Sequence, residues 1–453
     1  MIFRFTNSNV TLRNKGEFFI AVLTAIILVD LFLQLISVWV FIVLVFSCQI
    51  FYCNKYENAF IFILFVPMVI GAFFTSLGVA GIGGFFVPLG LILIWKDIYK
   101  ARTLLIKGYV PLFIIFILFG FSAYFNDGGD YYAIKLLNTF TYGTLSYIGF
   151  SILFINRGSV RFSLLALIFL LMGIFLLRLA IEINNLPGPS NLFHFGFLRE
   201  QTNVYGKNAL ISIDDFTISY HSPGFFSLVG LSFFLTDSKK YSKLMNWYVW
   251  ILTFIVIFYT GARQNLLAYI ILLMFYIFTL KKYSFIYKCL AIGTVGVVST
   301  LTLLSINSDV IQKVLLSSTI SGAIEASGRS ELISKGLELF NSSPLWGVGY
   351  GHYSFRGVFE VYPHNIIVEL LSEIGIFGFS CIIILCCYAV FKSRQALLFL
   401  NKHNFKPYLV LFPLLVRAMI SLNMTLNIIV LSFIFSLYCF KLDIIRRPLK
   451  YKS

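Results

Sequence analysis

Apolar runs long enough to cross a lipid bilayer follow one another through most of this chain. A membrane-spanning helix needs roughly 20 apolar residues, with about 17 as the lower limit. The chain is 59% hydrophobic and only 12% charged, whereas soluble domains carry about 25% charged residues. The sequence therefore predicts an all-α fold, a polytopic membrane helix bundle. About 14 candidate transmembrane helices are expected: residues 18–33, 35–53, 59–76, 79–95, 108–125, 133–155, 162–183, 222–236, 246–260, 263–280, 288–306, 366–390, 408–422 and 426–440.

The formal net charge of +16 comes from basic residues that sit in short clusters between apolar runs. This distribution is typical of cytoplasmic loops and excludes a nucleic-acid partner. If the amino terminus is cytoplasmic, every basic cluster falls inside, and the short outer loops carry acidic residues such as Asp30, Asp127 and Asp130. We therefore expect a membrane protein, in contact with membrane lipids, with both termini cytoplasmic.

The same assignment leaves two long loops on the periplasmic side, and these divide the chain. We expect N-terminal transmembrane helices in 1–183, a first large loop in 184–221 and central transmembrane helices in 222–306. A second large loop in 307–365 and C-terminal transmembrane helices in 366–453 follow. The second loop contains the amphipathic segment RSELISKGLELF and then a glycine-rich turn at Gly347–Gly351, which predicts a short helix followed by a tight loop.

None of the seven cysteines lies in a long polar loop. The cysteine pattern therefore indicates neither a disulfide framework nor a zinc site. The sequence also contains no phosphate-binding P-loop, no paired acidic metal site and no Ser/His/Asp order of the hydrolase kind. We expect no metal and no cofactor.

Several charged residues interrupt apolar runs, where charge is expensive and usually functional. Glu369 and Glu373 are four residues apart and share one helix face, and we interpret them as satisfying neighbouring helices. Arg178 is expected to pair with Glu182 at the same spacing, in a structural role. The pattern assigns no role to Arg417.

Three motifs occur in order in the second half of the chain. TGARQNLLAY contains Arg263 and Leu267, RSELISKGLELFNSSPLWGVGYGHY begins with Arg329, and PHNIIVELLSEIGIFG contains His364 and Gly375. Together they resemble the O-antigen ligase and O-antigen polymerase superfamily, over roughly residues 220–390.

This resemblance implies a membrane-embedded, GT-C-like glycosyltransferase that acts at the periplasmic face without a metal. Its donor would be a glycan linked to undecaprenyl diphosphate. A polymerase joins one lipid-linked oligosaccharide to another, so that this substrate is donor and acceptor, and a chain-length regulator protein would be a partner. A ligase moves the finished glycan onto the lipid A core of lipopolysaccharide.

Transfer from a diphosphate needs cations that hold the leaving anion and a base that activates the acceptor hydroxyl. Arg263 and Arg329 are the candidates for the diphosphate, because a guanidinium binds phosphate through two hydrogen bonds. His364 is the candidate base, because a helix start disfavours its charged form. The alternatives are an interfacial Arg263, a solvated Arg329 and a helix-capping His364.

The outer loops also hold residues suited to a glycan. Arginines bind its charged or hydroxyl groups and tyrosine rings suit sugar rings, although tyrosines also populate membrane interfaces. Five residues are candidate substrate-binding residues: Arg199, Tyr350, Tyr353, Arg356 and Tyr362. His221 and His352 are expected to be structural or to contact the glycan.

We expect a polymerase, with a ligase as the alternative, because both share these motifs and nothing in the sequence identifies the acceptor. A polysaccharide transporter or flippase would instead predict short loops, charges at mid-membrane and internal symmetry. A purely structural protein would leave Arg263, Arg329 and His364 unexplained.

Overall fold

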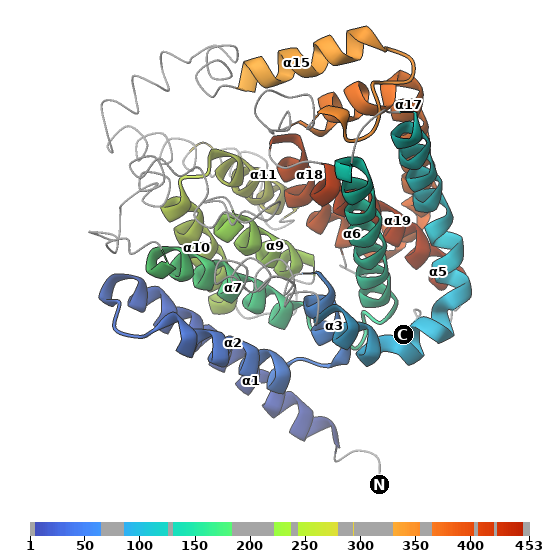
Figure 1. The fold of residues 1–453 in the computed structure, drawn as a ribbon. Helices are drawn as coiled ribbons and strands as arrows, with labels where there is room; N and C mark the ends of the chain where they lie inside the picture. Colours follow the sequence, from blue (N-terminus) through green and yellow to red (C-terminus); the bar gives the residue numbers. More distant parts are fainter. Residues whose placement is uncertain are drawn as a thin grey trace.

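The chain is described here by a computed structural model. It describes residues 5–64, 86–125, 130–183, 222–236, 243–279, 293, 329–353, 365–402, 406–420 and 424–446. Within these ranges the chain forms thirteen α-helices and one short 3-10 helix, and no strand. This confirms the all-α fold (Figure 1).

In chain order the helices are α1 (Phe5–Leu33), α2 (Val38–Tyr52), α3 (Lys55–Leu64), α5 (Phe86–Tyr124), α6 (Asp130–Ile155), α7 (Phe162–Ile183), α9 (Ser222–Thr236), α10 (Lys243–Thr260), α11 (Arg263–Thr279), α15 (Arg329–Ser342), α17 (Ile366–Lys402), the 3-10 helix η3 (Pro407–Val410), α18 (Leu411–Ile420) and α19 (Met424–Arg446).

Three helices are long and apolar enough to cross a membrane: Phe86–Tyr124, Phe162–Glu182 and Ile366–Arg394. Shorter apolar helices lie at 40–52, 222–236, 244–260, 264–277 and 407–419. These features make the described chain a helical membrane bundle. The expected count of 14 spans stays a prediction, since the candidates 288–306 and much of 59–76 lie outside the described residues.

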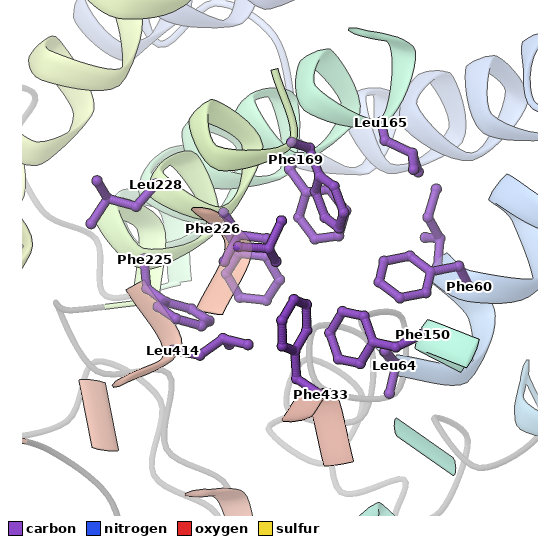
Figure 2. Packing of buried hydrophobic residues seen from close by; sticks show 14 of the residues in the cluster. Phe60, Leu64, Phe150, Leu165, Phe169, Phe225, Phe226, Leu228, Leu414 and Phe433 are labelled. Atoms are coloured by element: carbon purple, nitrogen blue, oxygen red, sulfur yellow. The ribbon is translucent and has the colours of Figure 1, made fainter. Parts of the chain in front are cut away.

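Helix α7 is the central helix of the bundle. Its span is buried along its whole length, as its apolar sequence on all sides requires, and α9 and α1 pack along it. Beside it lies a cluster of phenylalanine rings (Figure 2). Phe150 of α6 lies 5.2 Å from Phe60 of α3 and 4.9 Å from Phe433 of α19, both edge-on. Such edge-to-face pairs add to the free energy gained by burying the rings.

One expectation about the helices is wrong. The sequence predicts separate spans at 79–95 and 108–125, but residues 86–124 form a single helix, α5, of 39 residues. At 1.5 Å per residue it is about 58 Å long, almost twice the thickness of a hydrocarbon core. The basic residues between the two predicted spans are helical and exposed: Lys96, Lys100, Arg102 and Lys107. These charged residues have high helix propensity, so the helix continues through them, although hydropathy predicts a loop there.

Helix α15 lies across one end of the bundle, above the amino-terminal part of α17 (Figure 1). The carboxyl end of α5 and the amino end of α6 reach the same place, because Ser122 and Lys135 both contact Glu373 of α17. We call this region the α15 end. It contains the glycine-rich loop and the Glu369–Glu373 pair singled out in the sequence.

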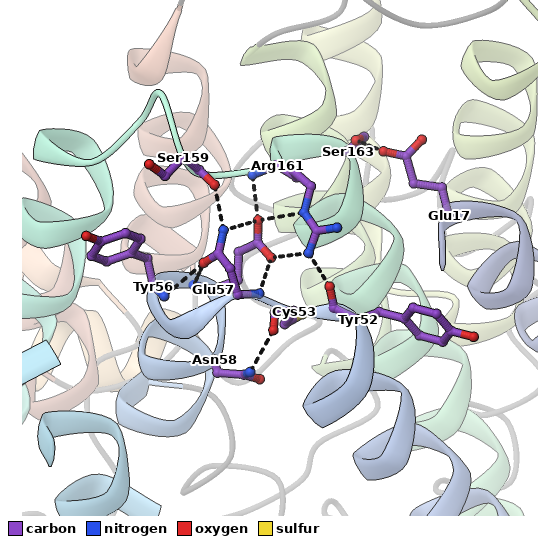
Figure 3. Close-up of polar contacts among 10 residues, drawn as sticks. Glu17, Tyr52, Cys53, Tyr56, Glu57, Asn58, Ser159, Arg161 and Ser163 are labelled. Atoms are coloured by element: carbon purple, nitrogen blue, oxygen red, sulfur yellow. Dashed lines mark hydrogen bonds and ion pairs between the residues drawn. The ribbon is translucent and has the colours of Figure 1, made fainter. Parts of the chain in front are cut away.

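A second polar cluster lies where the turns at 53–57 and 156–161 meet (Figure 3). Asn54 caps α3, since its side-chain oxygen accepts hydrogen bonds from the backbone N–H groups of Tyr56 and Glu57. The Glu57 carboxylate accepts the Asn54 N–H in return at 2.9 Å, which completes a capping box. Arg161 donates to the same carboxylate from its backbone and its guanidinium.

The expected pairing of Arg178 with Glu182 is confirmed. The Arg178 Nη2 atom lies 3.0 Å from a Glu182 carboxylate oxygen. Its Nε atom also donates to Asp30 of α1 at 2.9 Å, and the same Asp30 carboxylate accepts the N–H groups of Leu35 and Ile36. Arg178 therefore ties α7 to the turn between α1 and α2, a structural role.

Candidate functional site

Helix α17 is broken at Gly375. This residue has φ 66° and ψ −176°, which is far from helical backbone. The chain therefore contains a short first arm, Ile366–Ile374, and a longer second arm that starts at Ile376. A break at membrane depth is tolerated only where other protein groups satisfy the freed backbone groups.

The loop 344–349 supplies those groups. The N–H groups of Val348 and Gly349 donate to the carbonyls of Ser372 and Glu373, at 2.8 and 2.9 Å. In the opposite direction, the N–H of Ile376 donates to Pro344 at 2.9 Å and that of Phe377 to Leu345 at 3.2 Å. The loop thus replaces the hydrogen bonds that the break removes, and its backbone is inserted between the two arms of α17.

Two glycines make this close approach possible. A Cβ atom at Gly375 would lie 2.5 Å from the Gly347 nitrogen, and one at Gly347 would lie 2.5 Å from the Ile374 nitrogen. Both residues also have positive φ, 74° at Gly347 and 66° at Gly375, where a side chain is strained. The Gly-x-Gly run and the glycine of the third motif are therefore two halves of one backbone joint.

The first arm of α17 begins directly after the predicted base. Asn365 follows His364 in the chain, and its side-chain oxygen accepts the N–H groups of Ile367 and Val368 at 2.9 and 3.2 Å. This is an amino-terminal cap, so the capping role that was the alternative for His364 belongs to its neighbour. Position 364 is the last one before the cap.

Helix α15 packs on this first arm. A Cβ atom at Gly336 would press against Val368 and would lie 3.2 Å from the Tyr353 ring. The Tyr353 hydroxyl donates to the Leu332 carbonyl at 2.5 Å, which fixes the loop after Gly351 beneath α15. The amphipathic segment of the second motif therefore forms the predicted helix, and its apolar face covers the start of α17.

The tyrosines expected to form a sugar platform are inside the protein. Tyr350 has no exposed surface and Tyr353 is 2% exposed. The Tyr350 ring stacks on Phe119 at 4.4 Å, and its hydroxyl lies 2.6 Å from that of Thr139. Burial raises the pKa of both phenols well above its ordinary value, so both remain neutral hydroxyls. Because neither ring reaches solvent, the structure gives both a packing role in place of the expected sugar contact.

Below Tyr350 lies a buried cluster of three charges. The Lys135 ammonium of α6 lies 2.8 Å from Glu369 Oε1 and 2.8 Å from Glu373 Oε1, and all three side chains are at most 1% exposed. The two glutamates therefore satisfy a neighbouring helix, as the sequence indicates. Lys135 was not singled out there, although a lone lysine within the apolar run 133–155 carries the same signal as the glutamates.

A cavity of about 580 Å³ opens at the joint. Its walls are the carboxyl end of α5 with Phe125 after it, residues 346–349 of the loop and the residues of α17 around the break. They are mostly apolar, and Phe121 and Trp346 are largely exposed beside it. The cavity places apolar space next to the glycine loop, but neither Lys135 nor the two glutamates line it.

Arg263 is the first residue of α11, and the structure describes its backbone. The turn before it packs against the start of α9, because a Cβ atom at Gly224 would lie 2.5 Å from Asn265 Nδ2 and 3.3 Å from Thr260 Oγ1. In the last turn of α18, the Arg417 guanidinium stacks 3.9 Å above the Phe225 ring. This contact explains how a charge is tolerated in that apolar helix.

The remaining candidates are placed only in part. Arg329 is the first residue of α15, again described by its backbone. Four candidates lie outside the described residues: Arg199, Arg356, Tyr362 and His364. The expectation of no metal concerns those residues as well. Among the residues that the structure describes, no group of three or more His, Cys, Asp or Glu side chains could hold an ion.

A comparison with protein families bears on the same segment. Residues 248–383 match the family model described as O-Antigen ligase. Those residues form an O-antigen ligase family domain. The match includes α11, α15, the glycine loop and the break in α17, and so all three motifs of the O-antigen polymerase and ligase superfamily. Comparisons with curated proteins and with solved structures gave no match.

The match at 248–383 is consistent with the O-antigen polymerase and ligase superfamily, which is a glycosyltransferase-like enzyme family. The domain covers Arg263, Arg329 and His364. Two of its motifs, those of Gly347 and Gly375, are joined in space by the backbone hydrogen bonds of the loop. The sequence could not show this joint, because the two glycines are far apart in the chain.

Proposed function

We propose that this protein is an O-antigen polymerase of the bacterial inner membrane. It joins oligosaccharide repeat units linked to undecaprenyl diphosphate, at the periplasmic face. The α15 end would be the periplasmic end, and both termini would be cytoplasmic. The observation that supports the proposal most is the family domain at 248–383, which contains all three candidate catalytic residues.

In this proposal the three residues divide the chemistry of transfer. Arg263 and Arg329 hold the diphosphate of the donor, whose charge increases as the glycosidic bond to phosphate breaks. His364 accepts the proton of the acceptor hydroxyl, which then bonds to the anomeric carbon of the donor sugar. The reaction needs no metal, because the diphosphate leaves as a stable anion held by two guanidinium groups.

Supporting the same proposal, His364 directly precedes the capped start of α17 in the sequence. The dipole of a helix start disfavours an imidazolium, which keeps a histidine at such a position neutral and available as a base. Arg199, Arg356 and Tyr362 remain proposed contacts for the glycan. A chain-length regulator protein remains a proposed partner.

The proposal is tested by reconstituting the purified protein in liposomes with lipid-linked repeat units. Longer lipid-linked chains should form, as resolved by gel electrophoresis or mass spectrometry. The variant His364→Ala should reduce the rate at least about 100-fold, the usual contribution of a positioned general base. The exposed Glu338→Ala, on α15 within the same domain, is a matched control that should retain the wild-type rate.

The second candidate is a ligase, which the description of the matching family favours. The two are separated by adding lipid A core oligosaccharide to the same liposomes. Growth of lipid-linked chains without it supports the polymerase, whereas transfer only in its presence supports the ligase. A deletion strain gives the same answer in cells. Single-repeat lipopolysaccharide indicates a lost polymerase, and polymer left on its carrier lipid indicates a lost ligase.

A third outcome would reject both enzymes. If the liposomes form no new glycosidic bond with either acceptor but move lipid-linked repeat units between leaflets, the protein is a flippase. In that case His364→Ala would have no rate of transfer to reduce.

A further inference from the structure

The first arm of α17 is short and weakly held by its own helix. It spans Ile366–Ile374, about two and a half turns, and the break at Gly375 separates it from the rest of α17. The arm therefore has no continuous helix that fixes its rotation. The candidate base, His364, precedes the arm by two positions in the sequence.

The arm carries two carboxylates on one face. Glu369 and Glu373 are four residues apart, so they lie one above the other and repel each other. Neither has access to water, at 1% and 0% exposed. Buried like charges of this kind are tolerated only with a close cation.

Lys135 supplies that cation from α6. Its ammonium donates to Glu369 Oε1 at 2.8 Å and to both oxygens of Glu373, at 2.8 and 3.0 Å. A single ammonium can reach both glutamates only when this face of the arm points at α6. A rotation by one residue, about 100°, would turn both carboxylates away.

Hydrogen bonds on either side reinforce the same orientation. The Ser122 hydroxyl of α5 donates to the Glu373 carbonyl and accepts the Tyr350 N–H, both at 2.9 Å. Thr139, one turn after Lys135, contacts the Tyr350 hydroxyl. Helices α5 and α6 thus hold the arm and the glycine loop together.

Stability alone does not account for the cluster. Replacing a buried ion pair by apolar residues of similar volume is often neutral or stabilising. Apolar contacts, however, are not directional, and the backbone hydrogen bonds of the joint hold only the end of the arm, at Ser372 and Glu373. Charge-assisted hydrogen bonds fix the direction as well as the contact.

We propose that Lys135 is a positioning residue for the glycosyl transfer: through Glu369 and Glu373 it sets the rotation and depth of the first arm of α17, the helix that follows the candidate base in the chain. This inference rests on the proposed function for the reaction, but the contacts that carry it are independent of the acceptor. Lys135 itself touches no substrate.

The kinetic test compares three variants in the reconstituted assay, with kcat and KM normalised to folded protein. Lys135→Arg keeps the charge and two donors, and should retain kcat within about tenfold. Lys135→Met should lower kcat about 100-fold, the loss expected from displacing a catalytic group by about 1 Å. Its KM for the lipid-linked donor should change less than about threefold, because the cations that hold the diphosphate are untouched.

A third variant covers the case that Lys135→Met does not fold. In Lys135→Met combined with Glu369→Gln and Glu373→Gln no charge is left buried, so the protein should fold with a wild-type Tm. Its kcat should nevertheless stay low. The matched control is Lys55→Met, which breaks the Lys55–Asp97 pair at the opposite end and should keep the wild-type kcat. Wild-type kcat in the triple variant would overturn the proposal.

A distance measurement separates this inference from the proposed function. Spin labels are placed at position 364 and at the exposed Leu137 of α6, in a background without native cysteines. The wild-type cluster should give one narrow distance distribution, and the triple variant a broadened or shifted one. An unchanged distribution overturns the positioning role even if the wild type forms no glycosidic bond. A broadened distribution supports the role in either case.

Discussion

Two buried glutamate clusters in this protein are built in opposite ways. Glu57, at the meeting of two turns, accepts hydrogen bonds from the backbone of Asn54 and Arg161, the Asn54 amide and the Arg161 guanidinium. Its one negative charge faces one arginine. At the α15 end, two glutamates face one lysine, and the Gly351 backbone N–H also donates a hydrogen bond to Glu373.

The difference indicates that the Glu57 cluster stabilises the fold, whereas the Lys135 cluster positions a helix. The Glu57 cluster lies at the start of a helix and at a turn, where backbone N–H groups need hydrogen-bond partners. Every hydrogen bond removed there therefore lowers the stability of the fold. The Lys135 cluster joins side chains of α6 and α17, with Glu369 in the first turn of α17 and Glu373 just before its break. The cluster fixes the rotation of the first arm of α17, next to the break at Gly375 in that described helix. Three predictions test this contrast, beginning with the break itself.

The largest effect is expected at the joint. Gly375→Ala should lower the free energy of unfolding by roughly 3 kcal/mol or more, since it combines a strained φ with a collision against the backbone of the loop. The measurement is unfolding in detergent, followed by intrinsic fluorescence. Gly120→Ala in α5 is the control, because a Cβ there meets nothing within 4 Å. It should be neutral or stabilising.

A joint that tolerates alanine would contradict this account. If Gly375→Ala and Gly120→Ala unfold alike, loop 344–349 is not inserted in α17, and the contrast between the two clusters loses its basis.

A smaller effect should separate the two clusters directly. Glu57→Gln should cost about 2–4 kcal/mol, because the amide group meets donors on every side and Arg161 loses its partner. Glu373→Gln should cost less than about 1 kcal/mol, because one lysine then faces one glutamate and the buried charges balance. Both are measured by thermal unfolding in the same detergent. Equal losses of unfolding free energy would mean that both clusters serve mainly to stabilise the fold.

The smallest effect concerns the hydroxyl pair above Lys135. The Thr139 hydroxyl donates to the Lys135 carbonyl at 2.8 Å, so the Tyr350 hydroxyl donates to Thr139. Tyr350→Phe and Thr139→Val should each cost about 1 kcal/mol. The double variant should cost less than the sum, by about 0.5–1 kcal/mol in a double-mutant cycle. Full additivity would show that the two hydroxyls act independently.

Much of the fold follows from local patterns. Hydropathy located α7, α9 and α11 closely, since an apolar run bounded by polar residues has few alternatives. It failed at α5, where the basic residues between two apolar stretches are good helix formers, and hydropathy does not measure helix propensity. The pair Arg178 and Glu182 was predictable because its spacing lies within one helix.

The candidate site was predictable as a set of motifs but not as an arrangement. Tyr350 and Tyr353 were predicted to contact sugar because they lie beside a glycine-rich loop. Tyrosines in such a sequence can be either exposed or buried. Only the packing of Phe119 and of α15 decides that they are buried. Lys135 was missed because its partners, Glu369 and Glu373, lie 234 and 238 residues further along the chain.

By itself the sequence determined that this chain is a helical membrane protein whose residues 248–383 match the O-antigen ligase family. Composition, periodicity and motif order can all be read along the chain. The tertiary structure decided that Gly347 and Gly375 form one joint and that Lys135 holds the arm that begins at Ile366. Those contacts depend on distances between helices, which no spacing along the chain encodes.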